Sequence, residues 1–407
     1  MGVFQLESGG MVETCKKYGI DKIDDIIDLL ALYRPGAMQY IDQMIDVKKG
    51  VTKVEYEHPL LEEICGDTYG VMIYQEQVQN AAKLIAGYTL GGADLLRRAM
   101  GKKDPAKMAK ERVNFVKGAK ETNDIEPELA NKLFDKIEMF AGYGFNKSHS
   151  ACYGHISYWT AYLKANHPVE FMSGLLSNEL NNTDKIGIFI NECHRMDIEI
   201  LPPNINKSKL KFAPEKIPSG KMAIRFGLAA IKNVGEGAMR TALKDRDENG
   251  EFESLDDFSN RLDSKSVNKR ILENLVKAGA LDWTGETRAV MFDRIEQVVA
   301  SASSAQRDRA QGQVSLFDTM DFAGGGATQE QNGGSAPNIP EWTKDEKLAN
   351  EKELLGCYTS GHPLDKYREI IDSDRFEKIG MLDELDTKDK RARYPFAGMI
   401  RQVEHKV

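Results

Sequence analysis

Two strings decide how this chain is organised: GYTLGGADLLRRAMGKK at residues 87–103 and AGYGFNKSHS at residues 141–150. Between residues 97 and 120 the sequence holds nine Lys or Arg and two acidic residues, whereas the 407-residue chain has a formal net charge of −8. A local excess of positive charge either faces solvent or meets an anionic partner. This basic segment is therefore the first candidate for contact with a polyanion.

The residues after the first string predict two helices that present this charge. Asp94 is expected to cap the first helix, and Asp104 followed by Pro105 is expected to begin the second. At about 100° per residue, lysines share one side of the second helix and apolar residues the other. Such a lysine side either binds nucleic-acid phosphates or is an ordinary solvated face. The lysine side comprises Lys107, Lys110, Asn114 and Lys117, and the packed side comprises Met108, Ala109, Val113, Phe115, Val116 and Ala119.

The second string places hydrogen-bond donors at the start of a further helix. Residues 142–144 separate two helical patterns, and NKSHS at 146–150 leads into a helix that stops at His167-Pro168. Free backbone N–H groups at a helix N-terminus form a ready anion site. Two simpler roles stay open, because Ser150 can be only a cap and His149 only a hydrogen-bonded loop residue. The aromatic residues of this helix are expected in the core rather than stacked on bases: Tyr153, Tyr158, Trp159 and Tyr162.

Longer strings resemble a known family. They are GVFQLES at 2–8, YRPG at 33–36, TYGVMIYQEQ at 68–77, residues 88–103 and residues 142–149. Together they closely resemble the α subunit of bacterial DNA polymerase III, the C-family replicative polymerase, in order over nearly the whole chain. One departure lies at residues 151–154, which read ACYG where the family usually reads AAYA.

The resemblance implies template-directed DNA synthesis from dNTPs, with two Mg²⁺ ions held by palm aspartates. By family order those aspartates lie upstream of Met1 and an OB-fold begins near residues 394–407, so we expect an excised fragment without polymerase activity of its own. No catalytic residue or metal ligand is assigned in this chain. The resemblance implies instead that the chain positions the triphosphate through Arg97, Arg98, Lys102, Lys103, Asn146, Lys147, Ser148 and His149.

Two features of the N-terminal part have open roles. Arg34 lies in the turn signal Arg34-Pro35-Gly36 and either reaches a phosphate or serves the turn. The triplet at residues 75–77, Gln-Glu-Gln, follows an apolar run. Its residues are expected chiefly in packing, with contact to a template strand as the alternative.

Residues 221–282 change character and match a helix-hairpin-helix pattern. The string IKNVGEGA at 231–238 places two glycines in a tight turn before a helix that contains Arg240 and Lys244. Backbone N–H groups in such a turn can approach a DNA phosphate because no Cβ intrudes, although the same turn also joins helices for packing alone. The predicted DNA contacts of the chain are Lys107, Lys110, Lys117, Lys232, Gly235 and Gly237.

A polar segment from about residue 301 to 340 is interpreted as a flexible linker, since residues 324–338 are rich in Gly, Gln and Ala without periodicity. Within it, QVSLF at 313–317 resembles the pentapeptide by which bacterial replication proteins dock on the sliding clamp. The resemblance implies that Gln313 offers its amide to polar groups while Leu316 and Phe317 fill an apolar pocket. Local collapse of the two apolar residues is the simpler alternative.

Composition predicts a mainly α protein of two to three domains, with 41% apolar and 29% charged residues. We expect a fingers domain at 1–206, a helix-hairpin-helix region at 207–300, a flexible linker with the clamp-binding peptide at 301–345, and a connector with the start of an OB-fold at 346–407. No apolar run is long enough to span a bilayer. Five dispersed cysteines suit a reducing cytoplasm.

The expected partners are primer–template DNA, the sliding clamp and other polymerase III holoenzyme subunits, without a membrane. Three other functions compete with this reading. An autonomous DNA-binding scaffold would bind duplex whether or not dNTP is present, and a clamp adaptor would lose all its activity with Leu316 and Phe317. A phosphodiesterase would need a metal cluster, which the sequence does not offer.

Overall fold

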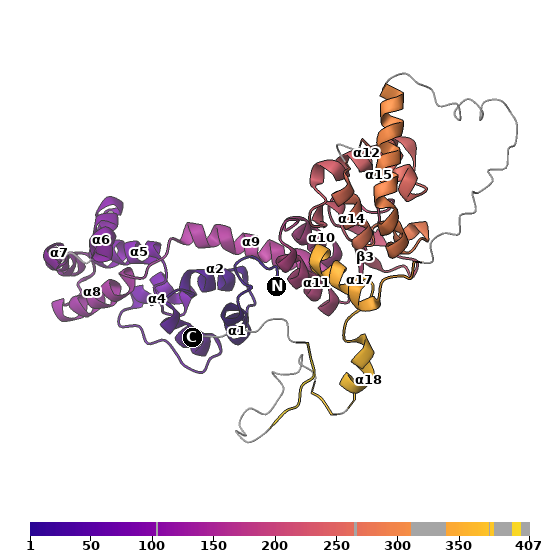
Figure 1. The fold of residues 1–407 in the computed structure, drawn as a ribbon. Helices are drawn as coiled ribbons and strands as arrows, with labels where there is room; N and C mark the ends of the chain where they lie inside the picture. Colours follow the sequence, from indigo (N-terminus) through magenta and orange to yellow (C-terminus); the bar gives the residue numbers. More distant parts are fainter. Residues whose placement is uncertain (103–104, 264–266, 311–338, 374, 378–392, 400–407) are drawn as a thin grey trace, which may run out of the picture. The chain divides into compact units, whose positions relative to one another are not determined.

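The computed structural model describes the chain except for residues 103–104, 264–266, 311–338, 374, 378–392 and 400–407. Most of the described residues lie in helices, with one small sheet, so the prediction of a mainly α chain is confirmed (Figure 1). The chain divides into two compact units, residues 1–167 (unit 1) and 168–407 (unit 2). This division falls at the His167-Pro168 step, whereas the sequence-based fingers domain extends to residue 206.

Unit 1 consists of helices joined by short connections. Proline begins three of them, at Pro59, Pro105 and Pro127, where its missing N–H costs no helical hydrogen bond. The predicted position of Pro105 is thus confirmed, and Asp104 lies outside the described residues. The elements are α1 (Gly9–Tyr18), α2 (Ile23–Leu32), η1 (Met38–Tyr40), α3 (Ile41–Lys48), α4 (Pro59–Cys65), η2 (Gly66–Thr68), α5 (Gln75–Ala86), α6 (Leu90–Lys102), α7 (Pro105–Asn123), α8 (Pro127–Ala141) and α9 (Lys147–Asn166).

The start of α6 differs from the predicted one. The helix begins at Leu90, before the glycine pair rather than after it. The hydroxyl of Thr89 accepts a hydrogen bond from the N–H of Gly92 at 3.2 Å, which is the capping interaction expected of Asp94. The prediction that Asp94 caps this helix is therefore wrong, because Asp94 already lies one turn inside it.

Aromatic rings fill the core where α7 meets α8. Phe115 of α7 and Phe134 of α8 are fully buried and meet edge to face, with 5.4 Å between ring centroids. The guanidinium of Arg112 covers the Phe134 ring at 4.5 Å from its centroid and pairs with Asp135 and Glu138 of α8. This member of the basic segment therefore stabilises the packing of two helices.

The first half of α9 packs along α2 through a close approach at Gly154 (Figure 1). A Cβ at residue 154 would lie 2.6 Å from Cγ1 of Ile27, so a larger residue there requires Ile27 to shift. Position 154 is one of those where the sequence departs from the usual family string. The close approach of Ile27 therefore accounts for glycine at position 154 in this chain.

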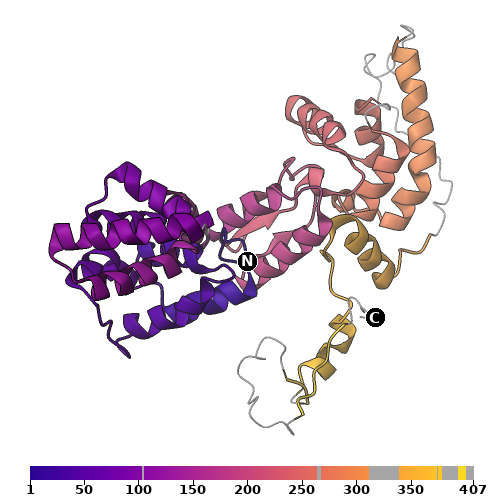
Figure 2. The same cartoon turned by 90° about the vertical axis from the view of Figure 1, so that its left-hand side faces the viewer.

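Unit 2 combines helices with a three-stranded sheet of order β1-β3-β2, in which β1 is parallel and β2 antiparallel to the central β3. The long helix α15 runs along the edge of this unit (Figures 1 and 2). The elements are α10 (Pro168–Ser177), α11 (Thr183–Arg195), β1 (Ile200–Leu201), β2 (Ala213–Lys216), β3 (Met222–Arg225), η3 (Leu228–Ala230), α12 (Glu236–Asn249), α13 (Leu255–Arg261), α14 (Lys269–Lys277), η4 (Asp282–Thr284), α15 (Arg288–Ala310), α17 (Lys344–Leu355), η6 (Asp365–Tyr367) and α18 (Arg368–Ile371).

A buried ion pair joins three parts of unit 2. The carboxylate of Glu351 on α17 has no exposed surface and accepts a bond from Nη1 of Arg288 on α15 at 3.0 Å. It also accepts bonds from the backbone N–H groups of Thr359 at 2.8 Å and Ser360 at 3.0 Å. Arg288 donates in addition to Asp282 at 2.9 and 2.7 Å. Residues on both sides of the undescribed segment 311–338 are thereby held together.

The resemblance places the start of an OB-fold near residues 394–407, and the structure shows no strand in the part of this range that it describes. Residues 394–399 belong to no strand, and residues 400–407 lie outside the description. The N–H of Glu377 donates to the carbonyl of Pro395 at 2.9 Å, but Pro395 has no N–H with which to return a bond. A strand needs a ladder of paired backbone groups, and this bond alone does not form one.

Candidate nucleic-acid interface

The N-terminus of α9 begins within the second string, as predicted, and Asn146 is its cap. The side-chain oxygen of Asn146 accepts bonds from the N–H of His149 at 2.9 Å and the hydroxyl of Ser148 at 2.5 Å. Ser150 is buried, and its hydroxyl donates to the carbonyl of Lys147 at 3.2 Å, so it does not cap the helix. Asn146, Lys147, Ser148 and His149 are thus brought together at one exposed helix end.

A carboxylate of the same chain occupies this helix end. The N–H of Lys147 donates to both carboxylate oxygens of Glu76 at 3.1 Å, and Nδ2 of Asn146 donates to one of them at 3.3 Å. Glu76 lies in the first turn of α5. A negative charge at a helix N-terminus is favoured by the free N–H groups and by the helix dipole. The end of α9 therefore already holds an anion, supplied by α5.

The loop before α9 is fastened to the start of α5 by backbone hydrogen bonds. The N–H of Phe145 donates to the carbonyl of Ile73 at 2.8 Å, and the N–H of Gln75 donates back to the carbonyl of Phe145 at 2.9 Å. The Gln75 side chain adds a bond to the carbonyl of Gly144 at 3.1 Å, and Gln77 accepts from the N–H of Ile73 at 2.8 Å. The polar triplet 75–77 therefore positions this loop.

Buried polar groups lie beneath the same loop. The Tyr74 hydroxyl donates to the carboxylate of Asp28 on α2, and both side chains are buried. Burial raises the pKa of Asp28 to about 6, although the Tyr74 bond and the Lys147 ammonium act in the opposite direction. The Lys147 ammonium lies 5.2 Å from the centroid of the Tyr74 ring. Arg34 donates through Nε to the carbonyl of Ala31 at 2.8 Å and through Nη2 to the carbonyl of Tyr143 at 3.0 Å, so it joins its own turn to the loop before α9.

The arginine pair of the first string lies on α6 and is held by Asp94. Nη2 of Arg97 approaches the Asp94 carboxylate at 3.0 Å, and Nε of Arg98 approaches it at 2.8 Å. The hydrogen bond from Arg97 lowers the pKa of Asp94, and the charges of both arginines act in the same direction. The side chain of Gln79 on α5 donates to the same carboxylate at 3.1 Å. Lys102 is the last residue of α6, and Lys103 lies outside the described residues.

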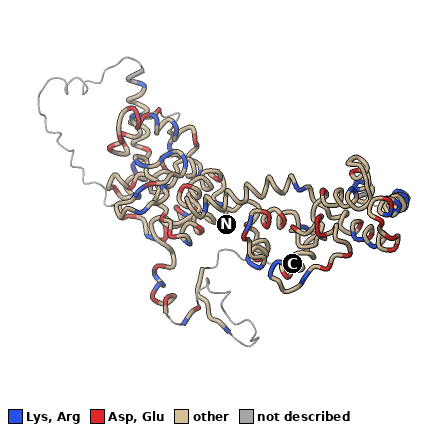
Figure 3. Tube along the Cα trace, turned by 180° about the vertical axis from the view of Figure 1, so that it is seen from behind, with Lys and Arg blue, Asp and Glu red and all other residues tan. Residues whose placement is uncertain are grey.

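The lysine side predicted for α7 is exposed in the structure, at Lys107, Lys110, Asn114 and Lys117. Lys117 lies 3.7 Å from Glu121, a distance at which an exposed ion pair is weak. Figure 3 shows acidic residues interspersed with basic ones over both units, so the positive side of α7 is a local feature. The apolar side is narrower than predicted, because Val113 is 68% exposed while Met108, Phe115 and Ala119 are buried.

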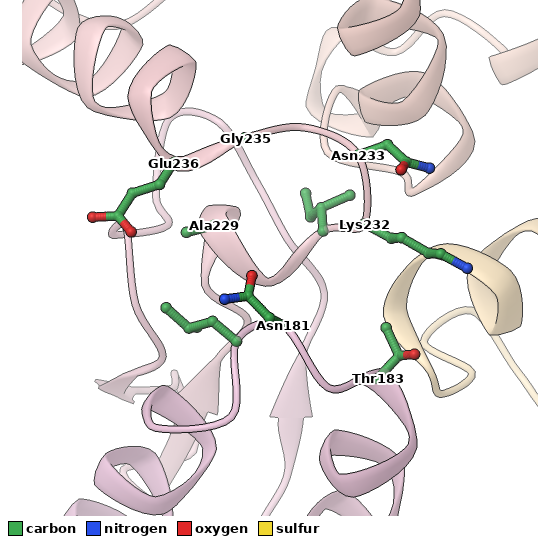
Figure 4. A pocket seen from close by; sticks show the side chains of 9 residues that line it. Asn181, Thr183, Ala229, Lys232, Asn233, Gly235 and Glu236 are labelled. Carbon is green, nitrogen blue, oxygen red and sulfur yellow. The ribbon is translucent and has the colours of Figure 1, made fainter.

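The glycine turn of unit 2 leads directly into α12. Gly235 precedes the helix with φ at +81°, a conformation that L side chains rarely adopt, and Gly237 lies in its first turn. A cavity of about 340 Å³ lies beside this turn, with Asn181 pointing into it below Gly235 (Figure 4). The Lys232 side chain is exposed and extends toward α17. The backbone N–H of Lys232 donates to the carbonyl of Leu354 on α17 at 3.0 Å. Arg240 pairs with Glu236 one turn away.

Comparison with known proteins assigns the class. The model of the bacterial DNA polymerase III alpha subunit finger domain matches residues 1–123, and a helix-hairpin-helix motif matches residues 197–291. The first match covers α1 to α7 and the second covers the glycine turn with α12 to α14. The chain thus combines a segment that matches this finger domain with a helix-hairpin-helix region.

Full-length relatives specify the family. The DNA polymerase III subunit alpha of Borreliella burgdorferi is 42% identical over 404 residues, which cover 99% of this chain and 34% of the relative. The DNA polymerase III subunit alpha of Vibrio cholerae is 44% identical over 372 residues, which cover 90% of this chain and 31% of the relative. That of Pseudomonas aeruginosa is 43% identical over 423 residues, which cover 98% of this chain and 35% of the relative. The chain therefore belongs to the family of bacterial DNA polymerase III α subunits. It spans about a third of the length of these relatives.

Sequence reasoning missed the residues that organise this surface. Glu76 and Gln79 on α5 engage the two predicted groups of basic residues, and Asp28 with Tyr74 supports the loop from below. Tyr74 and Glu76 belong to the 68–77 string, which the sequence indicated chiefly as a packing element, whereas Asp28 and Gln79 lie outside it and carried no signal. No three His, Cys, Asp or Glu side chains gather as metal ligands in the described part of the chain. No helix described here is long and apolar enough to cross a membrane.

Proposed function

We propose that this chain takes part in template-directed DNA synthesis from dNTPs, as the segment of a DNA polymerase III α subunit that positions the incoming nucleotide and the primer–template duplex. Its membership of the family and the helix-hairpin-helix match support this proposal. The proposal includes docking on the sliding clamp through Gln313, Leu316 and Phe317, which lie outside the described residues. It also includes a cytoplasmic holoenzyme with further subunits.

One observation carries the nucleotide-positioning role. Glu76 holds the N-terminus of α9, and Gln79 holds the Asp94–arginine cluster of α6. Residues three apart on a helix are neighbours, with about 5–6 Å between Cβ atoms. Two groups of basic residues that are far apart in the sequence therefore face the same side of α5. Such a surface can bind several phosphate groups of one ligand at once.

The chemistry follows from the charge that a triphosphate brings. Its oxygens accept hydrogen bonds from the N–H and ammonium of Lys147 and from the guanidinium groups of Arg97 and Arg98. Glu76 occupies the N–H of Lys147 in the absence of ligand, so the triphosphate replaces its carboxylate there. The anion stabilised by α9 then changes from the protein's own carboxylate to a phosphate.

We expect two substitutions at this helix end to act in opposite directions on dNTP affinity. Lys147→Ala weakens binding roughly tenfold or more, because a charge-assisted hydrogen bond is worth about 1.5–3 kcal/mol. Glu76→Gln strengthens binding roughly fivefold, because it removes a negative charge that competes with the phosphate. That competition weakens dNTP binding by on the order of 1 kcal/mol. The measurement is equilibrium dNTP binding by the full-length polymerase on a primer–template whose primer cannot be extended.

Lys132→Ala is the matched control, because Lys132 is exposed in the same unit and pairs with Glu128 on α8. It should leave dNTP affinity unchanged. Weaker binding by both Glu76→Gln and Lys147→Ala would assign the two residues a shared structural role and contradict the exchange of anions.

We expect the lysine side of α7 to bind duplex DNA through phosphates. Replacing Lys107, Lys110 and Lys117 together with Ala should weaken binding equally across sequences. It should also reduce the slope of log K against log salt by up to about 2–3, near 0.9 for each lost contact. Fluorescence anisotropy at several salt concentrations measures both effects. Replacement of the exposed lysines 16, 17 and 53 removes the same charge elsewhere and should leave the slope unchanged. An unchanged slope in the α7 variant would assign its lysines to solvent.

The acidic residues near this surface do not form a site for the Mg²⁺ that the family implies. The Asp94 carboxylate is engaged by Arg97, Arg98 and Gln79, and Glu76 by the end of α9. We therefore assign no Mg²⁺ ligand among the described residues and derive no step through the ion.

The same measurements distinguish the proposed function from two other functions. An autonomous DNA-binding scaffold would bind duplex with the same affinity whether or not a matched dNTP is present. A clamp adaptor would lose its activity with Leu316 and Phe317 alone, and the variants of α7 and α9 would have no effect. The helix-hairpin-helix turn, with Lys232, Gly235 and Gly237, contributes duplex phosphate contacts in the proposed function and in the scaffold alike.

A further inference from the structure

The second half of α9 exposes large aromatic side chains. Tyr158, Trp159 and Tyr162 are 46%, 58% and 50% exposed, which contradicts their expected place in the core. Gly154, which packs against Ile27 of α2, lies about 140° around the helix from Trp159. Three aromatic rings within five residues of one helix are thus left open among the described residues.

The exposed residues form one continuous stripe along α9. At spacings of four and three, residues 148, 152, 155, 159, 162 and 166 share one side of a helix, and all six are exposed. The stripe leads from Ser148, beside the anion-holding end, to Trp159 and Tyr162. This distance is about 21 Å at 1.5 Å per residue. The anion site and the aromatic rings therefore lie on the same side of one rigid helix.

The charge of α9 indicates which partner this stripe fits. The helix contains no Asp or Glu in twenty residues, although the chain has 63 acidic residues in 407 (Figure 3). Lys147 stands at its start and His155 lies on the stripe, whereas Lys164 lies on the other side of the helix and donates to the carbonyl of Met1 at 2.6 Å. The stripe itself reads Ser, Cys, His, Trp, Tyr and Asn, so its rings have polar tips, and the exposed aliphatic residues Ile156 and Leu163 flank it. Exposed rings on an acid-free surface are the combination that binds unpaired bases and their phosphates.

We propose that the exposed stripe of α9 binds single-stranded DNA by stacking unpaired bases on Trp159 and Tyr162. Every base has a face that can stack on an aromatic ring, so the surface requires no particular sequence. The strand runs along α9 toward the helix end at Asn146–Ser150. This inference rests on the proposed role in DNA synthesis, and it adds a contact to the unpaired strand.

Paired substitutions separate stacking from apolar packing. Trp159→Phe with Tyr162→Phe keeps both rings, whereas Trp159→Leu with Tyr162→Leu keeps apolar bulk without rings. The full chain is titrated with an oligo(dT) strand of about ten nucleotides, and anisotropy gives the affinity. We expect the Phe pair to bind within about threefold of the parent and the Leu pair to bind roughly a hundredfold more weakly, about tenfold for each ring.

Two further readouts keep the test decisive if the Leu pair unfolds. Base stacking on Trp159 should quench its fluorescence, so the quenching by oligo(dT) should be smaller in Trp159→Phe than in the parent. Cys152 lies on the stripe with an exposed thiol, so an oligonucleotide with an activated disulfide on one base should cross-link to it. A cysteine introduced by Lys132→Cys on α8, in a Cys152→Ser chain, should not cross-link.

Three results would overturn the proposal: parental affinity in the Leu pair, equal loss in the Phe and Leu pairs, or cross-linking at residue 132 as efficient as at Cys152. The first of these results, in a folded Leu pair, would indicate that the stripe contacts another protein surface rather than DNA. The dNTP and salt-slope measurements involve other residues, so the proposed function can hold while the stacking proposal fails.

Discussion

A chain with Leu316→Ala and Phe317→Ala should show no detectable binding to the sliding clamp of its own organism, while its fold and its DNA affinity stay nearly unchanged. The two residues stand in a polar, Gly-rich part of the sequence that supplies few apolar neighbours with which to form a core. An apolar pair in such a segment is best stabilised in a pocket of another protein. Burying a Leu or Phe side chain is worth roughly 1.5–3 kcal/mol.

The parent peptide is expected to bind with roughly micromolar affinity, since a short peptide that makes few contacts loses conformational entropy when it docks. Losing two anchors moves the dissociation constant beyond the range of titration calorimetry. Val314→Ala with Ser315→Ala is the matched control in the same segment and should retain binding within a few-fold. Binding of the double variant with the parental affinity would show that residues 313–317 are not the docking peptide.

Glu351→Ala should lower the free energy of unfolding of unit 2 by about 3–5 kcal/mol, the range for breaking a buried ion pair by removing one partner. Arg288 is 4% exposed, so the substitution leaves a buried guanidinium with only Asp282 as an acidic partner. The N–H groups of Thr359 and Ser360 lose their acceptor as well. Because these contacts join α15, α17 and the residues that follow, the loss extends through the unit.

Urea unfolding monitored by tryptophan fluorescence measures this effect in a Trp159→Phe background, where Trp283 and Trp342 of unit 2 remain. Glu296→Gln removes an exposed ion pair with Lys269 in the same unit and should leave the stability nearly unchanged, because solvent screens such a pair. A loss below 1 kcal/mol for Glu351→Ala would mean that water or a rearranged side chain satisfies Arg288.

The sequence predicted most of the helices because their signals are local. Pro105 begins α7 and the donor-rich string at 146–150 begins α9, since both depend on neighbours within one turn. The cap of α6 was wrong for a local reason too: Thr89 and Asp94 are both good caps, and a glycine pair can lie inside a helix as well as before it. Choosing between two such caps requires knowing where the helix packs.

Contacts between distant residues could not be predicted in the same way. Nothing near Glu76 in the sequence indicates that it meets Lys147, and nothing near Gln79 indicates that it meets Asp94. The aromatic residues of α9 show the opposite error, because ring-rich helices are usually buried and Trp159 is not. Apolar composition indicates that a side chain avoids water on average, and only the arrangement of neighbouring helices decides which ring is covered.

The carboxylate of Glu76 at the end of α9 has a consequence for selectivity among anions. Because it is attached to the same chain, its effective concentration at Lys147 is on the order of millimolar or higher. A small monovalent anion in solution makes one contact and must compete against that local concentration. In the proposed function a triphosphate also contacts Arg97 and Arg98, so its valence would compensate for the displaced carboxylate. If the helix end serves the proposed function, we expect it to exclude chloride and to bind polyvalent anions.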